Sequence, residues 1–158
     1  LYRELSGHPG FVLGTFSGFL DTRHPQRAHL ASLKAGSWVY GTLSTWIGSP
    51  DKNRGWEMLA DAKRHYDRVV AAGTLEPGIA ERALMQLAVC ESSDWFWWFG
   101  DYNPAQSVSD FERLFRVHLS NLYQLLGVEP PAYLSESFTH GNGTPERDGV
   151  MRTGSEPT

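Results

Sequence analysis

A helical repeat of apolar residues in the middle of the chain constrains the fold more than any other feature. Between residues 50 and 126, apolar side chains recur at intervals of three and four, a spacing that places them on one face of a helix. Helix-starting and helix-ending signals interrupt this repeat, and the expected helices cover residues 50–72, 77–98 and 109–126. Amphipathic helices joined by short links bury their apolar faces against one another. The chain is therefore predicted to be mainly all-α, with a three-helix bundle.

Each predicted helix begins at a recognisable signal. Ser49 is suited to cap the first helix, and Pro50 fits the first helical position because the N–H it lacks would have no helical partner there. Pro77 opens the second helix in the same way. Ser109 and Glu112 have the spacing of a capping box, which places the start of the third helix.

The apolar faces of the three helices predict the core of the bundle. The residues expected in this core are Leu59, Tyr66, Leu84, Leu87, Phe111, Phe115 and Leu122. Lys52 lies in the first turn of the first helix, and we expect it to point to solvent, as charged side chains usually do.

The two ends of the chain differ from this central part. Residues 1–37 mix turn signals with short apolar runs, so we expect an irregular segment that begins with the last turn of a helix. Residues 135–158 are rich in Gly, Ser, Thr, Glu, Arg and Pro, a composition that predicts a disordered tail. The helical bundle domain is therefore expected to span residues 38–134, in a chain that is a piece of a longer protein.

Size and charge exclude several classes of protein. A chain of 158 residues with 41% hydrophobic content is long enough for one domain with a core. The net charge of -4, without a run of Lys or Arg, argues against nucleic acid or an anionic membrane as partner. No apolar run approaches the roughly 18 residues that a membrane-spanning helix needs, and nothing demands an oxidising compartment, so a cytoplasmic location is expected. The single cysteine and the scattered histidines predict neither a metal site nor a cofactor.

Aromatic and acidic residues alternate between residues 91 and 102. This segment holds three of the six Trp of the chain beside three carboxylates. If the second helix continued through it, Glu91, Asp94 and Trp95 would lie on the inward face, where they would line a cleft. Aromatic faces and carboxylates together suit a sugar. The alternative is a buried aromatic seam in which these acids bond to Arg54, Arg116 or a loop backbone.

A second aromatic stretch precedes the first helix. Between residues 36 and 48, small and hydroxyl residues alternate with aromatic ones, a pattern typical of a loop or short helix that covers a cleft. Trp38 and Trp46 from this stretch, together with Trp95, are the predicted platforms on which sugar rings stack.

Three ordered motifs within these aromatic regions resemble the C-terminal part of glycoside hydrolase family 57. They lie at residues 35–38 (AGSW), 46–56 (WIGSPDKNRGW) and 93–101 (SDWFWWFGD), and the resemblance covers roughly residues 1–134. It implies a parent enzyme that acts on α-glucans such as starch and glycogen. It also implies that residues 1–37 are the end of a catalytic barrel, on which the helical bundle packs to complete the substrate cleft.

The resemblance carries over a supporting role only. Neither catalytic carboxylate of the family has a matching motif here, and retaining hydrolysis needs two of them. The expected substrate-binding residues are Trp38, Trp46, Glu91, Asp94 and Trp95. The chain alone is expected to be inactive, with an α-glucan oligosaccharide or polysaccharide and the barrel as its partners. Two other classes stay open, namely a standalone carbohydrate-binding module and a structural bundle that packs on a partner.

Overall fold

A computed structural model of the chain describes residues 1–26 and 28–141. The chain divides into two units, one formed by Leu1–Lys34 and the other beginning at Ala35. The first unit contains helices α1 (Tyr2–Gly7) and α2 (Phe16–Arg23), and neither buries any residue. Helix α1 is the turn expected at the start of the chain. Helix α2 was not predicted, and it begins where the Thr15 hydroxyl accepts a hydrogen bond from the Gly18 N–H at 3.1 Å.

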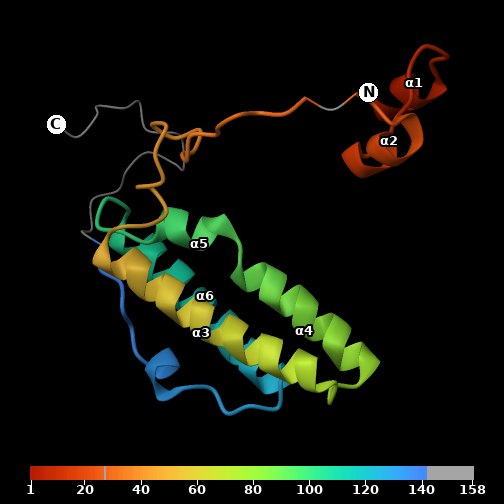
Figure 1. Ribbon diagram of the computed structural model, residues 1–158. Coiled ribbons are helices and arrows are strands. Elements are labelled where there is room, and N and C mark those ends of the chain that lie inside the picture. The colour runs from red at the N-terminus through yellow and green to blue at the C-terminus, as the bar shows by residue number, and fades with distance from the viewer. Residues whose placement is uncertain (27, 142–158) are drawn as a thin grey trace. The chain divides into compact units, whose positions relative to one another are not determined.

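The second unit is the helical bundle. Its elements are α3 (Pro50–Ala72), α4 (Pro77–Cys90), α5 (Ser93–Trp98), α6 (Ala105–Leu125) and the 3-10 helix η1 (Ala132–Ser135). Helices α3, α4 and α6 lie side by side, with α4 running opposite to the other two, and the short α5 lies at one end of this bundle (Figure 1). The described residues contain helices and no strands, which confirms the all-α prediction.

The helix boundaries agree with the sequence signals in part. Helix α3 begins at Pro50 and ends at Ala72, and Gly73 follows it with a φ of 66°, in the left-handed region that favours glycine. The expected second helix is broken, because Glu91 ends α4 and the Ser92 side chain caps a separate helix, α5. Helix α6 starts at Ala105, before the predicted capping box. Ser109 is therefore inside the helix and caps nothing.

Glu112 of that predicted box has a different role in the structure. Its side chain is buried and pairs with Arg116 at 2.7 Å, one turn further along α6. It also accepts a hydrogen bond from the backbone N–H of Phe138 at 3.1 Å. A buried carboxylate is stable when it is paired and hydrogen-bonded in this way, so Glu112 ties the C-terminal segment to α6.

Most of the predicted core is confirmed. Leu59, Leu87, Phe115 and Leu122 are buried, and Tyr66 and Phe111 are partly buried against them. Leu84 is the exception, with 57% of its surface exposed. The buried residues of α4 are Ala83, Leu87 and Cys90, so the face that packs is turned away from Leu84.

Gly55 allows α3 and the aromatic segment to approach closely. A Cβ atom at this position would lie 3.1 Å from a ring carbon of Phe99 and 3.2 Å from one of Phe96. Both rings are fully buried. A larger residue at position 55 would push the aromatic segment away from α3.

The folded bundle continues past residue 134, where the disordered tail was expected to begin. The ring of Phe138 lies 5.4 Å from that of Phe99 and 6.4 Å from that of Phe115, between ring centroids. The backbone N–H of His140 donates to the Asp51 carboxylate at 2.8 Å. The rest of the predicted tail, residues 142–158, lies outside the described residues.

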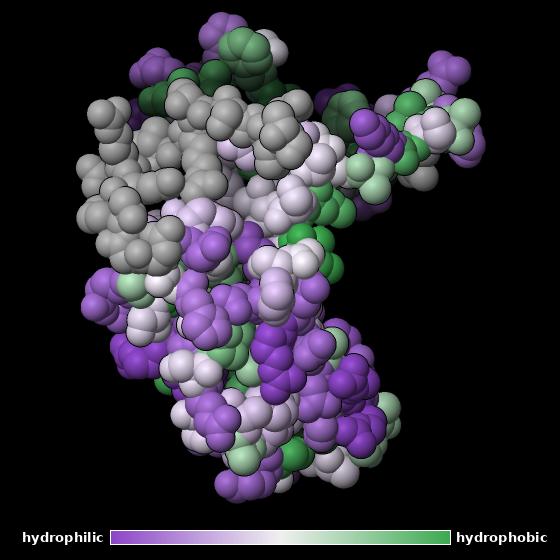
Figure 2. Space-filling view, turned by 90° about the vertical axis from the view of Figure 1, so that its left-hand side faces the viewer, coloured by the Kyte–Doolittle hydropathy of each residue, from purple (hydrophilic) through white to green (hydrophobic). Residues whose placement is uncertain are grey.

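The helices present mostly polar side chains outward. Figure 2 shows one face of the molecule, on which hydrophilic residues predominate over the helices and hydrophobic residues form small separate groups. Within residues 1–26 and 28–141, none of the helices has the length and apolarity that a membrane span requires.

Candidate functional site

Three tryptophans come together at the end of the bundle that carries α5. The rings of Trp38 and Trp97 stack nearly parallel, with centroids 6.2 Å apart and planes 11° apart. The ring of Trp46 is tilted by 47° against Trp97 at a centroid distance of 6.1 Å. Trp38 keeps 71% of its surface exposed, whereas Trp46 and Trp97 are partly buried. We call these three side chains the Trp cluster.

The segment that carries Trp38 is held by local hydrogen bonds. The Ser37 hydroxyl oxygen accepts from the Val39 N–H at 3.1 Å and also contacts the Thr42 carbonyl. Gly36 leaves room for the Gly41 carbonyl, which a Cβ atom would collide with. This turn therefore presents Trp38 from a defined backbone position, although the segment contains no helix or strand.

Trp46 is fixed by contacts to α3 and α5. Its carbonyl accepts a hydrogen bond from the indole N–H of Trp56 at 2.9 Å. The Trp56 ring stacks on Phe96, with centroids 3.9 Å apart and planes 7° apart. Because Phe96 belongs to the buried core, this stack connects the Trp46 backbone to the interior of the bundle.

Polar residues hold the backbone of α5 beneath the Trp cluster. The Asn103 amide donates to the carbonyls of Trp97 and Trp98, both at 3.0 Å, and the Tyr102 hydroxyl donates to the Trp97 carbonyl at 3.3 Å. Lys52 contacts the Tyr102 hydroxyl and the Thr45 carbonyl and is only 1% exposed. The expectation of a solvated Lys52 is therefore wrong, because acceptors from two loops surround its ammonium group.

Trp95 lies in the core and not in the Trp cluster. It is 8% exposed, and its indole N–H donates to the Val89 carbonyl at 2.8 Å. Its ring packs against Phe111, Phe115 and His118, at centroid distances of 6.2, 5.8 and 5.6 Å. A ring enclosed in this way presents little face to a sugar. In this respect the structure agrees with the alternative of a buried aromatic seam.

The two acids predicted to point inward are exposed. Glu91 ends α4 and Asp94 is in the first turn of α5, so neither is on the buried face that a continuous helix would have given them. The inward orientation was wrong because the chain breaks at Ser92. Arg54 and Arg116, the suggested ion-pair partners, pair instead with Glu57 at 3.0 Å and Glu112 at 2.7 Å. The sugar-binding role of Glu91 and Asp94 stays a prediction.

Several residues of this site do not carry a signal strong enough to mark them in the sequence as part of it. Trp97, Lys52, Tyr102 and Asn103 all contribute to it, and none was predicted to do so. A signal for Trp97 was present, since Ser92 and Asp94 form a second helix start within the presumed second helix. Because they are two residues apart, Trp95 and Trp97 fall about 200° apart around a helix, on opposite faces.

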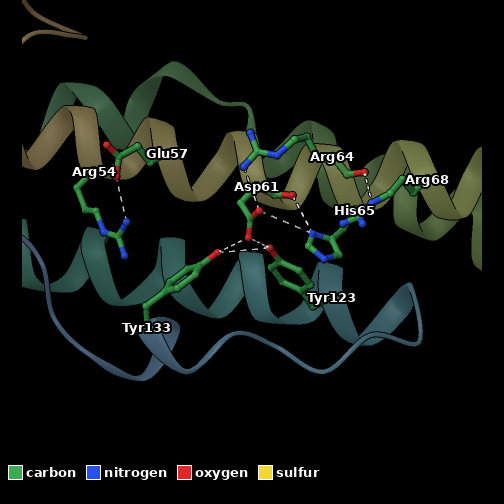
Figure 3. Close-up of polar contacts among 8 residues, drawn as sticks. All are labelled: Arg54, Glu57, Asp61, Arg64, His65, Arg68, Tyr123 and Tyr133. Carbon is green, nitrogen blue, oxygen red and sulfur yellow. Dashed lines mark hydrogen bonds and ion pairs between the residues drawn. The ribbon is translucent and has the colours of Figure 1, made fainter.

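Asp61, Arg64, Tyr123 and Tyr133 form a polar cluster, the Asp61 cluster, that joins α3, α6 and η1. The Asp61 carboxylate accepts hydrogen bonds from the hydroxyls of Tyr123 at 2.9 Å and Tyr133 at 2.8 Å, and it pairs with Arg64 at 3.0 Å (Figure 3). Burial raises the pKa of Asp61, but the hydrogen bonds from both tyrosines and from Arg64 outweigh it and hold the pKa below its ordinary value. Burial, together with contacts to Tyr133 and Asp61, raises the pKa of Tyr123 far above its ordinary value.

The Asp61 cluster connects three elements and keeps its carboxylate ionised. Arg64 donates to the Asp61 carboxylate at 3.0 Å, and His65 Nδ1 lies 3.1 Å from the Asp61 carbonyl oxygen (Figure 3). Across the described part of the chain, no three side chains of the His, Cys, Asp and Glu types come together as a metal site would require.

Comparison of the chain with protein-family models, with curated proteins and with solved structures gives no match.

Proposed function

We propose that this chain is the C-terminal helical region of an α-glucan-acting enzyme of glycoside hydrolase family 57, in which the Trp cluster forms part of the wall of the glucan cleft. The observation that carries this proposal is the exposed ring of Trp38, stacked on Trp97 with Trp46 beside them. Exposed aromatic rings held in fixed positions offer flat apolar faces to the C–H faces of glucose rings.

The arrangement of the three motifs supports the proposal. Trp38 comes from the motif at residues 35–38, Trp46 from that at 46–56 and Trp97 from that at 93–101, and the Trp97 ring contacts both of the others. Motifs that are far apart in the sequence and meet at one exposed place are expected of a binding site. A bundle stabilised only by its core has no need of them there.

The chemistry is assigned to the parent protein. Retaining glycoside hydrolysis uses two carboxyl groups about 5–5.5 Å apart across the scissile bond, and we assign neither group to this chain. The bundle would pack on the catalytic barrel and supply binding and orientation, while the barrel would supply the nucleophile and the acid/base. The chain alone should therefore release no reducing sugar from starch or glycogen.

The proposal is tested by titrating maltoheptaose into the full chain and following tryptophan fluorescence. We expect saturable binding that the Trp38→Ala variant loses, and cellohexaose, with its different ring linkage, should bind more weakly. Phe16→Ala is the matched control, because Phe16 is an aromatic residue with 94% of its surface exposed in the first unit. Equal maltoheptaose binding by the wild type and Trp38→Ala would refute the proposal.

A standalone carbohydrate-binding module is the second candidate. It is favoured by the fact that the three tryptophans meet within this chain, without a barrel. A binding module would hold maltoheptaose as tightly alone as within its parent protein. A cleft wall would still bind it when isolated, but more weakly than within the parent protein, since the barrel is then missing.

A further inference from the structure

Lys52 is a buried cation at the base of the Trp cluster, and burial of an ammonium group is unfavourable unless acceptors surround it. Its Nζ donates to the Thr45 carbonyl and to the Tyr102 hydroxyl, and it lies 4.7 Å from the centroid of the Tyr102 ring. These contacts therefore stabilise the positive charge of Lys52 in the interior of the protein.

Two acceptors of Lys52 are each connected to a tryptophan of the Trp cluster. Thr45 directly precedes Trp46, so the first hydrogen bond holds the backbone beside that ring. The Tyr102 hydroxyl in turn donates a hydrogen bond to the Trp97 carbonyl at 3.3 Å, so it links Lys52 to the backbone of α5. The polar chain from Thr45 through Lys52 and Tyr102 to Trp97 therefore bridges the same gap that the Trp46 and Trp97 rings span at 6.1 Å.

Core packing alone does not account for this bridge. Trp46 packs against the core cluster from the loop before α3, whereas Trp97 is not among the residues of that cluster or those packed on it. The position of Trp97 relative to Trp46 therefore depends also on the polar contacts of the loops before α3 and after α5. Lys52 is bonded to both of these loops.

We propose that Lys52, acting through Tyr102, is a positioning residue that sets the geometry of the Trp cluster and thereby the fit of a glucan to it. The functional part of this inference rests on the proposed function. The geometric part concerns the rings alone and is testable without any sugar.

The test compares Lys52→Met, which keeps the length of the side chain and removes the ammonium group, with Lys63→Met. Lys63 is a matched control because it lies on the same helix and pairs with Asp67 at 2.6 Å, outside the Trp cluster. The readout is the exciton couplet that closely spaced indoles produce in circular dichroism. We expect Lys52→Met to lose most of this couplet while its helical signal is retained, and Lys63→Met to keep it.

Tyr102→Phe provides a second variant that keeps the aromatic ring and removes only the hydroxyl. It should reduce the couplet and leave the fold intact, so the inference stays testable if Lys52→Met fails to fold. A wild-type couplet in a folded Lys52→Met, or in Tyr102→Phe if the first variant does not fold, would overturn the inference.

Sugar binding separates this inference from the proposed function. If the wild-type chain binds maltoheptaose, Lys52→Met should weaken that binding about tenfold, with Lys63→Met unchanged. Unchanged affinity in Lys52→Met would overturn the functional part. If the wild-type chain shows no saturable binding of maltoheptaose even at millimolar concentration, the proposed function fails, and the couplet alone decides whether Lys52 positions the rings.

Discussion

The two faces of α5 carry the same kinds of residue and have opposite environments. On the inner face, Trp95 and Phe96 are buried among residues of α4 and α6, and Phe99 joins them just after the helix ends. On the outer face, Trp97 meets Trp38 and Trp46, and Trp38 remains mostly exposed. Residues two apart on a helix point about 200° apart, so Trp95 points into the core and Trp97 points toward the Trp cluster.

The difference teaches that aromatic content alone does not identify a binding site. Trp95 was predicted as a sugar platform because it stands beside Asp94 in an aromatic segment, and the structure buries it. Trp97 was not selected, and the structure places it beside the most exposed tryptophan of the Trp cluster. What distinguishes them is the position of the helix break at Ser92 and the surface that each face then meets.

The inner face should carry most of the stability. Phe96 is fully buried and its ring contacts Trp56, Phe99 and Phe115. Phe96→Ala should lower the free energy of unfolding by about 3–5 kcal/mol, because it removes a large ring and leaves a cavity. Urea denaturation of the full chain measures this, and a loss below about 1 kcal/mol would show that the inner face is not part of the core.

Two neighbouring leucines of α4 extend the comparison to another helix. Leu87 is 3% exposed and Leu84 is 57% exposed, although both fit the apolar repeat. Leu87→Ala should cost about 2–5 kcal/mol of unfolding free energy, and Leu84→Ala less than about 1 kcal/mol. The pair is its own control, since the chemical change is identical. Equal losses would mean that the packed face of α4 is assigned incorrectly.

A substitution in the Asp61 cluster tests whether the stability of the bundle also depends on polar contacts away from α5. Asp61→Asn removes the charge that both tyrosine hydroxyls donate to, and it should cost about 1–3 kcal/mol near neutral pH. The folded-state pKa of Asp61 is lowered, so its stabilisation is present above the unfolded-state pKa and is lost as the pH falls through the folded-state value.

The difference in stability between wild type and Asp61→Asn should therefore shrink as the solution is acidified. Denaturation at several pH values, from neutral to strongly acidic, follows this change. Asp67→Asn is a suitable control, because Asp67 is an exposed carboxylate on the same helix that pairs with Lys63 at 2.6 Å. A pH-independent difference for Asp61→Asn would contradict the role assigned to its ionised form.

The outer face should contribute least to stability. Trp38→Ala removes a ring that is 71% exposed, so its effect on the free energy of unfolding should stay within about 0.5 kcal/mol. Thermal denaturation of Trp38→Ala beside Phe96→Ala gives the sharpest form of the comparison. A loss from Trp38→Ala as large as that from Phe96→Ala would mean that the Trp cluster is structural.

Much of the fold was predictable because it depends on local geometry. Helical periodicity identified Leu59, Leu87, Phe115 and Leu122 as core residues, since residues three and four apart share a face whatever the helix packs against. Pro50 marked the start of α3 by the chemistry of the backbone alone. Signals of this kind lie within a few residues of the feature that they predict.

The site was less predictable because it depends on segments that are distant in the sequence. Sequence placed Trp38 and Trp46 in one aromatic stretch, but only the tertiary structure brought Trp97 to them. The exposure of Leu84 was decided by which face of α4 meets its neighbours, and two adjacent faces were equally apolar. Lys52 is buried because acceptors from residues 45 and 102 converge on it. A charge turns inward only where such partners already exist, and the tertiary structure alone provides them.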